Sequence, residues 1–200
     1  MKRGRLLAAL TIGTVLMTAR AASAYDPAAT FKQGTYVLSV EGGGGGQHNL
    51  EGQDIQTRLE FWNVGVRVSM IPWGPVNSKA LYGALEIGLE PYYQRYTTPV
   101  DAHFAGLGLA FRYHFLALGR LVPYVEIFGS AGETDLKVRE IDSRFTFLLH
   151  GGPGIEYFVT DRAALYVGYR LQHISNGNTD RPNRGFESQT GVAGISVFFP

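Results

Sequence analysis

The feature that most constrains the fold of this chain is an alternation of apolar with polar or small side chains that recurs in eight segments. A period of two places successive side chains on opposite faces of an extended strand, whereas a helix has a period near 3.6. The segments lie near residues 31–42, 57–70, 80–91, 103–115, 122–131, 144–157, 163–174 and 187–199. We therefore predict an all-β chain without a second domain.

The second face of these segments distinguishes a membrane barrel from a soluble sheet. In segment 103–115, Leu107, Leu109 and Phe111 share one face, while Gly108 and Arg112 share the other. Charged side chains mixed with glycines suit the crowded interior of a small barrel, and about ten residues suffice for a tilted transmembrane strand. The prediction is an eight-stranded antiparallel transmembrane β-barrel. A secreted β-sandwich or a lipocalin-like barrel is the alternative.

Aromatic residues and connections add detail to the barrel prediction. If both termini are periplasmic, the glycine run 42–46 with its following polar stretch, segment 92–102 and segment 175–186 form outward loops, and 159–162 forms a short periplasmic turn. The glycine run precedes no Gly-Lys-Ser/Thr motif, so we expect a flexible exposed loop and not a phosphate-binding loop. Aromatics expected in girdles at the membrane interfaces are Trp62, Trp73, Tyr92, Tyr93 and Tyr157.

The N-terminus has the features of an export signal. A basic stretch that ends at Arg5 precedes the apolar run 6–17, and Ala22-Ser23-Ala24 forms an A-x-A cleavage site. We expect residues 1–24 to be a signal peptide and residues 25–200 to form the barrel domain in the outer membrane. No later run of about 18 apolar residues predicts a membrane-spanning helix.

Charge and composition exclude several functions. The chain has 18 basic and 17 acidic residues, and removal of residues 1–24 takes away four basic ones, which leaves 14 basic residues and a net charge of −3. This balance gives no indication of a nucleic-acid partner. Without cysteine there is no disulfide or thiolate nucleophile, and the histidines lack metal-ligand spacing. We expect no metal or organic cofactor.

The segment HISNGNTDRPNRGFES, residues 173–188, contains the candidate site. Leu171, His173 and Ser175 share the parity that faces lipid, because Arg170 and Gln172 belong in the lumen. Glu187 has the outward parity of the last strand. Opposed residues on paired strands bring Cβ atoms to about 5 Å, so the hairpin can bring His173, Ser175 and Glu187 together at the extracellular rim.

These three side chains suit an acyl-transfer reaction. Ser175 would attack, His173 would take its proton, and Glu187 would orient and stabilise the imidazolium. Asparagine side chains or N–H groups of the loop could hold an oxyanion. The alternative is a rim where polar residues merely leave the hydrocarbon, with Asn176-Gly177 as turn residues.

The same stretch resembles the catalytic region of the PagL-type lipid A 3-O-deacylases, which are eight-stranded outer-membrane esterases. In that family a histidine, a serine two residues later and a glutamate twelve residues after the serine form the triad. His173, Ser175 and Glu187 match this spacing. The resemblance also implies that Asn176 and Asn183 support activity near the oxyanion. One departure is Pro200, where such barrels usually end in an aromatic residue.

The resemblance implies hydrolysis of the ester-linked 3-hydroxyacyl chain at position 3 of lipid A, with lipopolysaccharide in the outer leaflet as the partner. Two alternatives from other classes stay open. One is a small barrel without enzymatic activity that binds surface ligands through its loops. The other is a lipid A acyltransferase or a phospholipase barrel. The sequence leaves both a monomer and a homodimer open.

Overall fold

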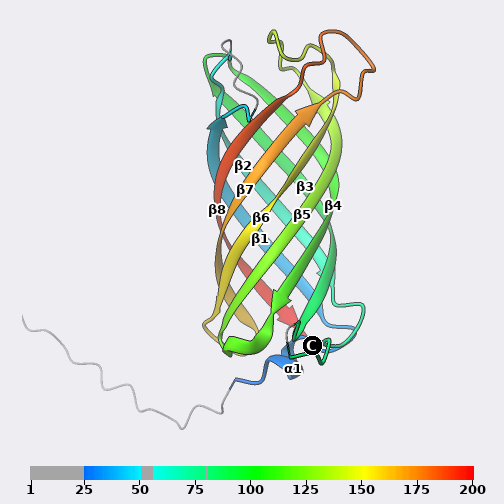
Figure 1. Ribbon diagram of the computed structural model, residues 1–200, viewed down its shortest axis with the longest axis vertical. Coiled ribbons are helices and arrows are strands. Elements are labelled where there is room, and N and C mark those ends of the chain that lie inside the picture. Colours follow the sequence, from blue (N-terminus) through cyan, green and yellow to red (C-terminus); the bar gives the residue numbers. More distant parts are fainter. Residues whose placement is uncertain (1–24, 51–55, 80) are drawn as a thin grey trace, which may run out of the picture.

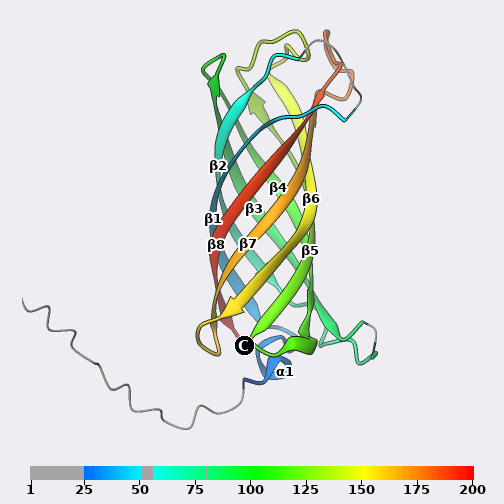
Figure 2. The same ribbon diagram turned by 60° about the vertical axis from the view of Figure 1, so that its left-hand side comes forward.

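The computed structural model describes residues 25–50, 56–79 and 81–200. Eight strands form one closed antiparallel barrel in which each strand pairs with its sequence neighbours and β1 pairs with β8. Figures 1 and 2 show this wall from two sides. The strands are β1 (Tyr36–Gln47), β2 (Glu60–Met70), β3 (Gly83–Thr98), β4 (Ala102–Phe115), β5 (Leu121–Thr134), β6 (Phe145–Phe158), β7 (Ala163–Ser175) and β8 (Phe186–Phe199). The prediction of an eight-stranded antiparallel transmembrane barrel is confirmed.

Helical structure is minor in the described ranges. The short helix α1 (Pro27–Thr30) and the 3-10 helix η1 (Leu116–Leu118) lie at the end of the barrel that also holds the C-terminus (Figure 1). Neither of them is long and apolar enough to cross a membrane. The predicted signal peptide, residues 1–24, lies outside the described residues.

Alternation divides every strand between an apolar exterior and a buried interior. On β7, Leu165, Val167 and Tyr169 are exposed, while Tyr166 and Arg170 are buried. The other strands repeat this pattern, and the exposed large residues are mostly Leu, Val, Ile and aromatics. Such a surface around a closed barrel is suited to lipid, where all backbone groups must be paired within the protein.

Charged residues fill the middle of the barrel. The carboxylate of Glu126 pairs with three guanidinium groups, at 2.7 Å from Arg67, 2.6 Å from Arg112 and 2.5 Å from Arg170. The guanidinium group of Arg170 also pairs with Glu41, which belongs to the same network. Buried charges are tolerated when they are paired and hydrogen-bonded, and this network occupies the space that a pore would need.

Apolar clusters fill the barrel on either side of the charged layer. The cluster toward the loop end includes Phe61, Phe104 and Phe186, and the cluster toward the terminal end includes Phe31 and Phe198. Five pockets of the described residues lie on the outer wall of the barrel or in a loop. A ligand that contacts these pockets would approach the barrel from outside or at the rim.

The glycine run was placed wrongly by the sequence analysis. Residues 42–46 are not a loop but the second half of β1, paired with both β2 and β8. The neighbouring backbone explains the composition. A Cβ on Gly43 would lie 2.5 Å from the carbonyl oxygen of Gly191, and a Cβ on Gly45 would overlap the carbonyl oxygen of Gln189. Glycine permits this close approach of β1 to β8.

Segment 92–102 was also wrongly predicted as a long loop. Strand β3 continues to Thr98 and only residues 99–101 connect it to β4. Tyr92 does not belong to an interface girdle, since it is 3% exposed and lies inside the barrel. It has the inward parity of Glu90 on the same strand. By contrast, the turn 159–162 is confirmed, and the predicted loop 175–186 spans residues 176–185.

We predict that Val167→Lys destabilises the barrel by about 2–4 kcal/mol, because it places a charge on the lipid-facing wall near mid-height of β7. Val159→Lys is the matched control, since Val159 is similarly exposed but lies in the turn at the terminal end. Unfolding by urea in lipid vesicles gives both free energies. Equal costs at the two positions would contradict a lipid-facing β7.

Candidate functional site

The pairing of β7 with β8 brings two candidate residues into contact. His173 lies directly opposite Glu187 in the register, and its Nδ1 is 3.0 Å from Glu187 Oε1. Both side chains are partly exposed, 43% for His173 and 29% for Glu187. The predicted outward parity of these residues therefore produces the expected histidine–carboxylate contact.

This contact selects which imidazole nitrogen is free to act as a base. An ionised carboxylate only accepts hydrogen bonds, so Nδ1 of His173 carries the proton that it donates to Glu187. The other nitrogen, Nε2, is then left with a lone pair. A histidine held in this tautomer can accept a proton from a neighbouring hydroxyl.

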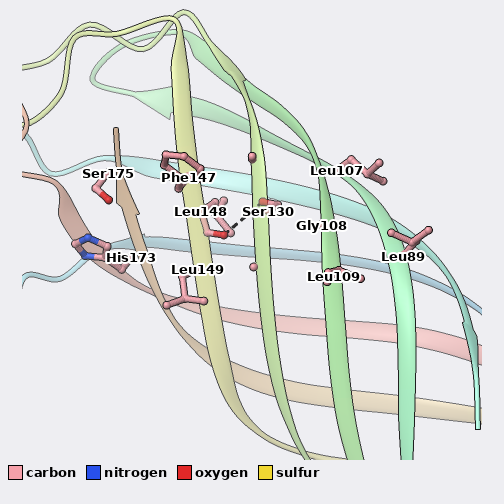
Figure 3. A pocket seen from close by; sticks show the side chains of 12 residues that line it. Leu89, Leu107, Gly108, Leu109, Ser130, Phe147, Leu148, Leu149, His173 and Ser175 are labelled. Atoms are coloured by element: carbon pink, nitrogen blue, oxygen red, sulfur yellow. Dashed lines mark hydrogen bonds between the residues drawn. The ribbon is translucent and has the colours of Figure 1, made fainter. Parts of the chain in front are cut away.

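Ser175 lies two residues along β7 from His173 on the same outer face (Figure 3). Its neighbour on β6 is Phe147, just as His173 is opposite Leu149. Within the described residues the Ser175 hydroxyl makes no hydrogen bond, so the expected hydrogen bond between Ser175 and His173 is not formed here. Such contacts are often long or poorly aligned in substrate-free sites and tighten when a substrate binds.

An apolar groove of about 630 Å³ begins at Ser175 and His173 and runs across the outer wall (Figure 3). Its depth comes from β5, where Gly129 and Ala131 place almost no side chain on the lipid-facing surface. The larger residues that line it on β3, β4 and β6 are Leu89, Leu107, Leu109, Phe147 and Leu149. A second groove, of about 310 Å³, includes Leu50, Leu171, His173 and Glu187 on the other side. The histidine therefore lies between two apolar depressions.

The loop 176–185 is organised by its asparagines. Asn176 is fully buried, and its side chain accepts a hydrogen bond from Asn178 N at 3.0 Å and donates one to Asp180 O at 3.1 Å. Asn183 Oδ1 accepts from Asn176 N at 2.8 Å. Asn183 also donates to Asn178 Oδ1 at 3.0 Å. The side-chain amides of both residues, which were predicted to act near an oxyanion, thus form hydrogen bonds that fix the shape of the loop.

Gly185 is a residue at the site that the sequence analysis did not single out. Its φ of +65° is strained for residues with a side chain. A Cβ at this position would lie 2.8 Å from Ile174 O and 3.0 Å from His173 Cε1. The glycine of the P-N-R-G stretch therefore leaves room for the His173 ring, a requirement that sequence alone does not reveal.

The β1–β2 connection also reaches the site. His48 N donates to Glu187 O at 2.9 Å, and Glu187 N donates to Asn49 Oδ1 at 3.3 Å. These bonds hold the backbone of Glu187 where β8 begins. No sequence pattern predicts these bonds, because residues 48 and 49 are far from the hairpin along the chain.

Comparison with known proteins supplies a family. The model of the family described as lipid A 3-O-deacylase (PagL) matches residues 62–196, which include all three candidate residues. No curated protein sequence matches the chain.

Two solved structures share the fold. The crystal structure of the outer membrane enzyme PagL has 19% identity and a TM-score of 0.61, and the match covers 78% of this chain and 97% of that one. The crystal structure of Neisserial surface protein A has 19% identity and a TM-score of 0.59, with 84% of this chain and 100% of that one covered. At such identity the likeness concerns the fold alone.

We predict that Gly185→Ala shifts the imidazole resonances of His173 in NMR spectra of histidine-labelled protein in micelles. The new Cβ would press on the ring and would cost about 1–2 kcal/mol for the positive φ. Gly34→Ala is the matched control, because Gly34 also has a positive φ, +84°, but nothing lies within 4 Å of its added Cβ. Unchanged His173 signals in Gly185→Ala would show that the glycine does not shape the site.

Proposed function

Because the chain belongs to the family of lipid A 3-O-deacylases, we propose that it is an outer-membrane serine esterase that removes the 3-hydroxyacyl chain esterified at position 3 of lipid A. The observation that carries this proposal is the contact of His173 Nδ1 with Glu187 at 3.0 Å, next to Ser175 on the lipid-facing wall. Ionisable residues on such a wall are costly and call for a function.

The proposed reaction is a two-step acyl transfer to water. Ser175 Oγ attacks the ester carbonyl carbon while His173 Nε2 takes the hydroxyl proton. The tetrahedral intermediate collapses, and His173 returns the proton to the sugar oxygen that leaves. Water then cleaves the acyl-serine with His173 again as the base, which releases a 3-hydroxy fatty acid. Glu187 stabilises the imidazolium in both steps.

The loop 176–185 is the source of oxyanion donors in this proposal. Asn176 and Asn183 support activity by fixing the loop backbone, since each has hydrogen-bond partners inside it. The N–H of Gly177, two residues after Ser175, takes part in none of the hydrogen bonds of the described residues. It is therefore available to a substrate oxygen, as an oxyanion donor must be.

The substrate would approach the site laterally, from within the membrane. In this proposal the loop end of the barrel is extracellular, so that Ser175 lies at the level of the outer leaflet, which contains lipid A. The groove beside Ser175 is almost entirely apolar and lies on the lipid-facing wall. An acyl chain can enter it without leaving the hydrocarbon region, because the groove and the leaflet are both apolar.

Mass spectrometry of lipid A from cells that express the protein should show the loss of one 3-hydroxyacyl group. Cells that express Ser175→Ala should keep the complete lipid A. A gain of one acyl chain would identify an acyltransferase, and unchanged lipid A with a folded protein would favour a barrel without enzymatic activity.

Ser175→Ala and His173→Ala should each lower kcat by on the order of 10⁴- to 10⁶-fold, because nucleophile and base act as a unit. Glu187→Ala should cost about one to two orders of magnitude less, since the orienting residue is the least costly of the three. Turnover of purified lipid A by protein in micelles measures all three.

Gln189→Ala is the matched control, because Gln189 lies two residues from Glu187 on the same face of β8. It should keep turnover close to that of the wild type. If Ser175→Ala also kept it, Ser175 would not be the nucleophile.

A further inference from the structure

Glu140 lies in a loop at the same end of the barrel as the candidate triad, although no step of the proposed reaction uses it. It belongs to the β5–β6 connection, residues 135–144, and only 1% of its surface is exposed. No ion pair with a Lys, Arg or His side chain is formed by its carboxylate in the part of the chain that the structure describes. Burying a charge without a counterion is costly unless hydrogen bonds compensate, so the contacts of this carboxylate are informative.

The carboxylate is held by the last residue of β1 and by the β1–β2 connection. Glu140 Oε1 accepts hydrogen bonds from Thr57 N at 2.9 Å and from Gln47 Nε2 at 3.0 Å. Glu140 Oε2 accepts from Thr57 Oγ1 at 2.6 Å. Burial raises the pKa of this carboxyl, but the hydrogen bonds from Thr57 and Gln47 outweigh it and leave the pKa below its usual 4.5. The group is therefore an ionised acceptor at neutral pH.

The backbone around Glu140 holds the β7–β8 loop. The carbonyl oxygen of Glu140 accepts from Arg184 N at 2.9 Å and from Gly185 N at 3.2 Å. The next residue, Ile141, is fully buried and forms a β-bridge with Asn183. One residue thus connects the β1–β2 connection through its side chain with the β7–β8 loop through its backbone.

Both connections continue to the candidate triad. Gly185 lies against the His173 ring, and Asn183 holds the backbone N–H of Asn176, the residue after Ser175. On the other side, Gln47 Nε2 also donates to Asn49 Oδ1 at 3.3 Å, and the same oxygen accepts from the backbone N–H of Glu187. A shift of Glu140 would therefore move the surroundings of His173, Ser175 and Glu187 together.

We propose that Glu140 is a positioning residue of the esterase, which fixes the loop 176–185 against the β1–β2 connection so that the His173 ring and the loop N–H groups face the substrate ester. The inference rests on the proposed function. It adds a residue that touches neither the substrate nor the triad side chains. Small displacements of a reacting group can lower the rate by about 10²-fold, so such a residue affects catalysis strongly.

The test compares Glu140→Gln with Asp142→Asn. Glutamine keeps the size of the side chain but presents an NH₂ group to donors that need an acceptor. Asp142 lies in the same connection, is exposed, and loses the same charge in its variant. We expect Glu140→Gln to lower kcat about 10- to 100-fold with KM within about twofold of the wild type, because the apolar residues that line the groove on β3 to β6 are untouched. Asp142→Asn should change neither.

Hydrogen–deuterium exchange of residues 176–187 is measured on the same samples. The amide of Gly185 loses its fixed acceptor when Glu140 moves, so exchange of this segment should rise in Glu140→Gln and not in Asp142→Asn. Wild-type exchange in Glu140→Gln would overturn the proposal. Faster exchange with wild-type kcat would also overturn it, since loosening the loop would then have no effect on catalysis.

A second pair of variants addresses Thr57 and guards against misfolding of Glu140→Gln. Thr57→Val removes the hydroxyl that donates to Glu140, whereas Thr57→Ser keeps it. We expect Thr57→Val to lower kcat, and Thr57→Ser to keep kcat close to that of the wild type. The effects of Thr57→Val and Glu140→Gln should not add in the double variant, because both variants disrupt the same contact. Equal kcat for the two Thr57 variants would contradict the proposal. If wild-type protein showed no esterase activity, the proposed function would fail, whereas the exchange data would still decide whether Glu140 holds the loop.

Discussion

The closure of the hydrogen-bonded ladder of β1 onto β8 is the constraint on which the rest of the structure depends. Lipid offers no hydrogen-bond partners, so a sheet that spans the hydrocarbon must satisfy every backbone group within itself, and only a closed sheet does so. Closure in turn makes alternation strict, since each strand must show one face to lipid and the other to a narrow interior. The glycines of β1 are part of this constraint, because their missing side chains let β1 approach the backbone of β8 at Gly191 and Gln189.

Alternation also explains why the candidate site lies on the outside of the barrel. The interior is occupied by the Glu126 ion-pair network and by two apolar clusters. The outward row of β7 is apolar until it reaches His173 and Ser175, where the register places Glu187 opposite the histidine. The barrel thus supplies a rigid strand pair for the histidine and the carboxylate, while the loops fix what surrounds them. Glu140 connects two of these loops, which is the basis of its proposed positioning role, because a catalytic site needs rigid support.

Sequence reasoning succeeded where the period of two applied and failed where contacts are distant along the chain. The parity of His173 and Ser175 followed from Arg170 and Gln172, and that of Glu187 from the alternation of the last strand. The contact of His173 with Glu187 followed from antiparallel pairing. The extent of β1 and β3 did not follow, because a glycine run and a Tyr-rich segment resemble loops until their partners on β8 and β4 are known. The role of Gly185 depends on its φ, and that of Glu140 on three loops that meet only in the folded chain.

Covalent capture of the nucleophile tests the central claim most directly, namely that Ser175 on the lipid-facing wall is activated by His173. A lipid-soluble fluorophosphonate, which forms a stable bond with activated serines, is added to the protein in vesicles, and the modified residue is located by tandem mass spectrometry. The account predicts a single adduct on Ser175 that forms far more slowly in His173→Ala. No adduct on Ser175, or equal labelling with and without the His173 imidazole, would contradict it.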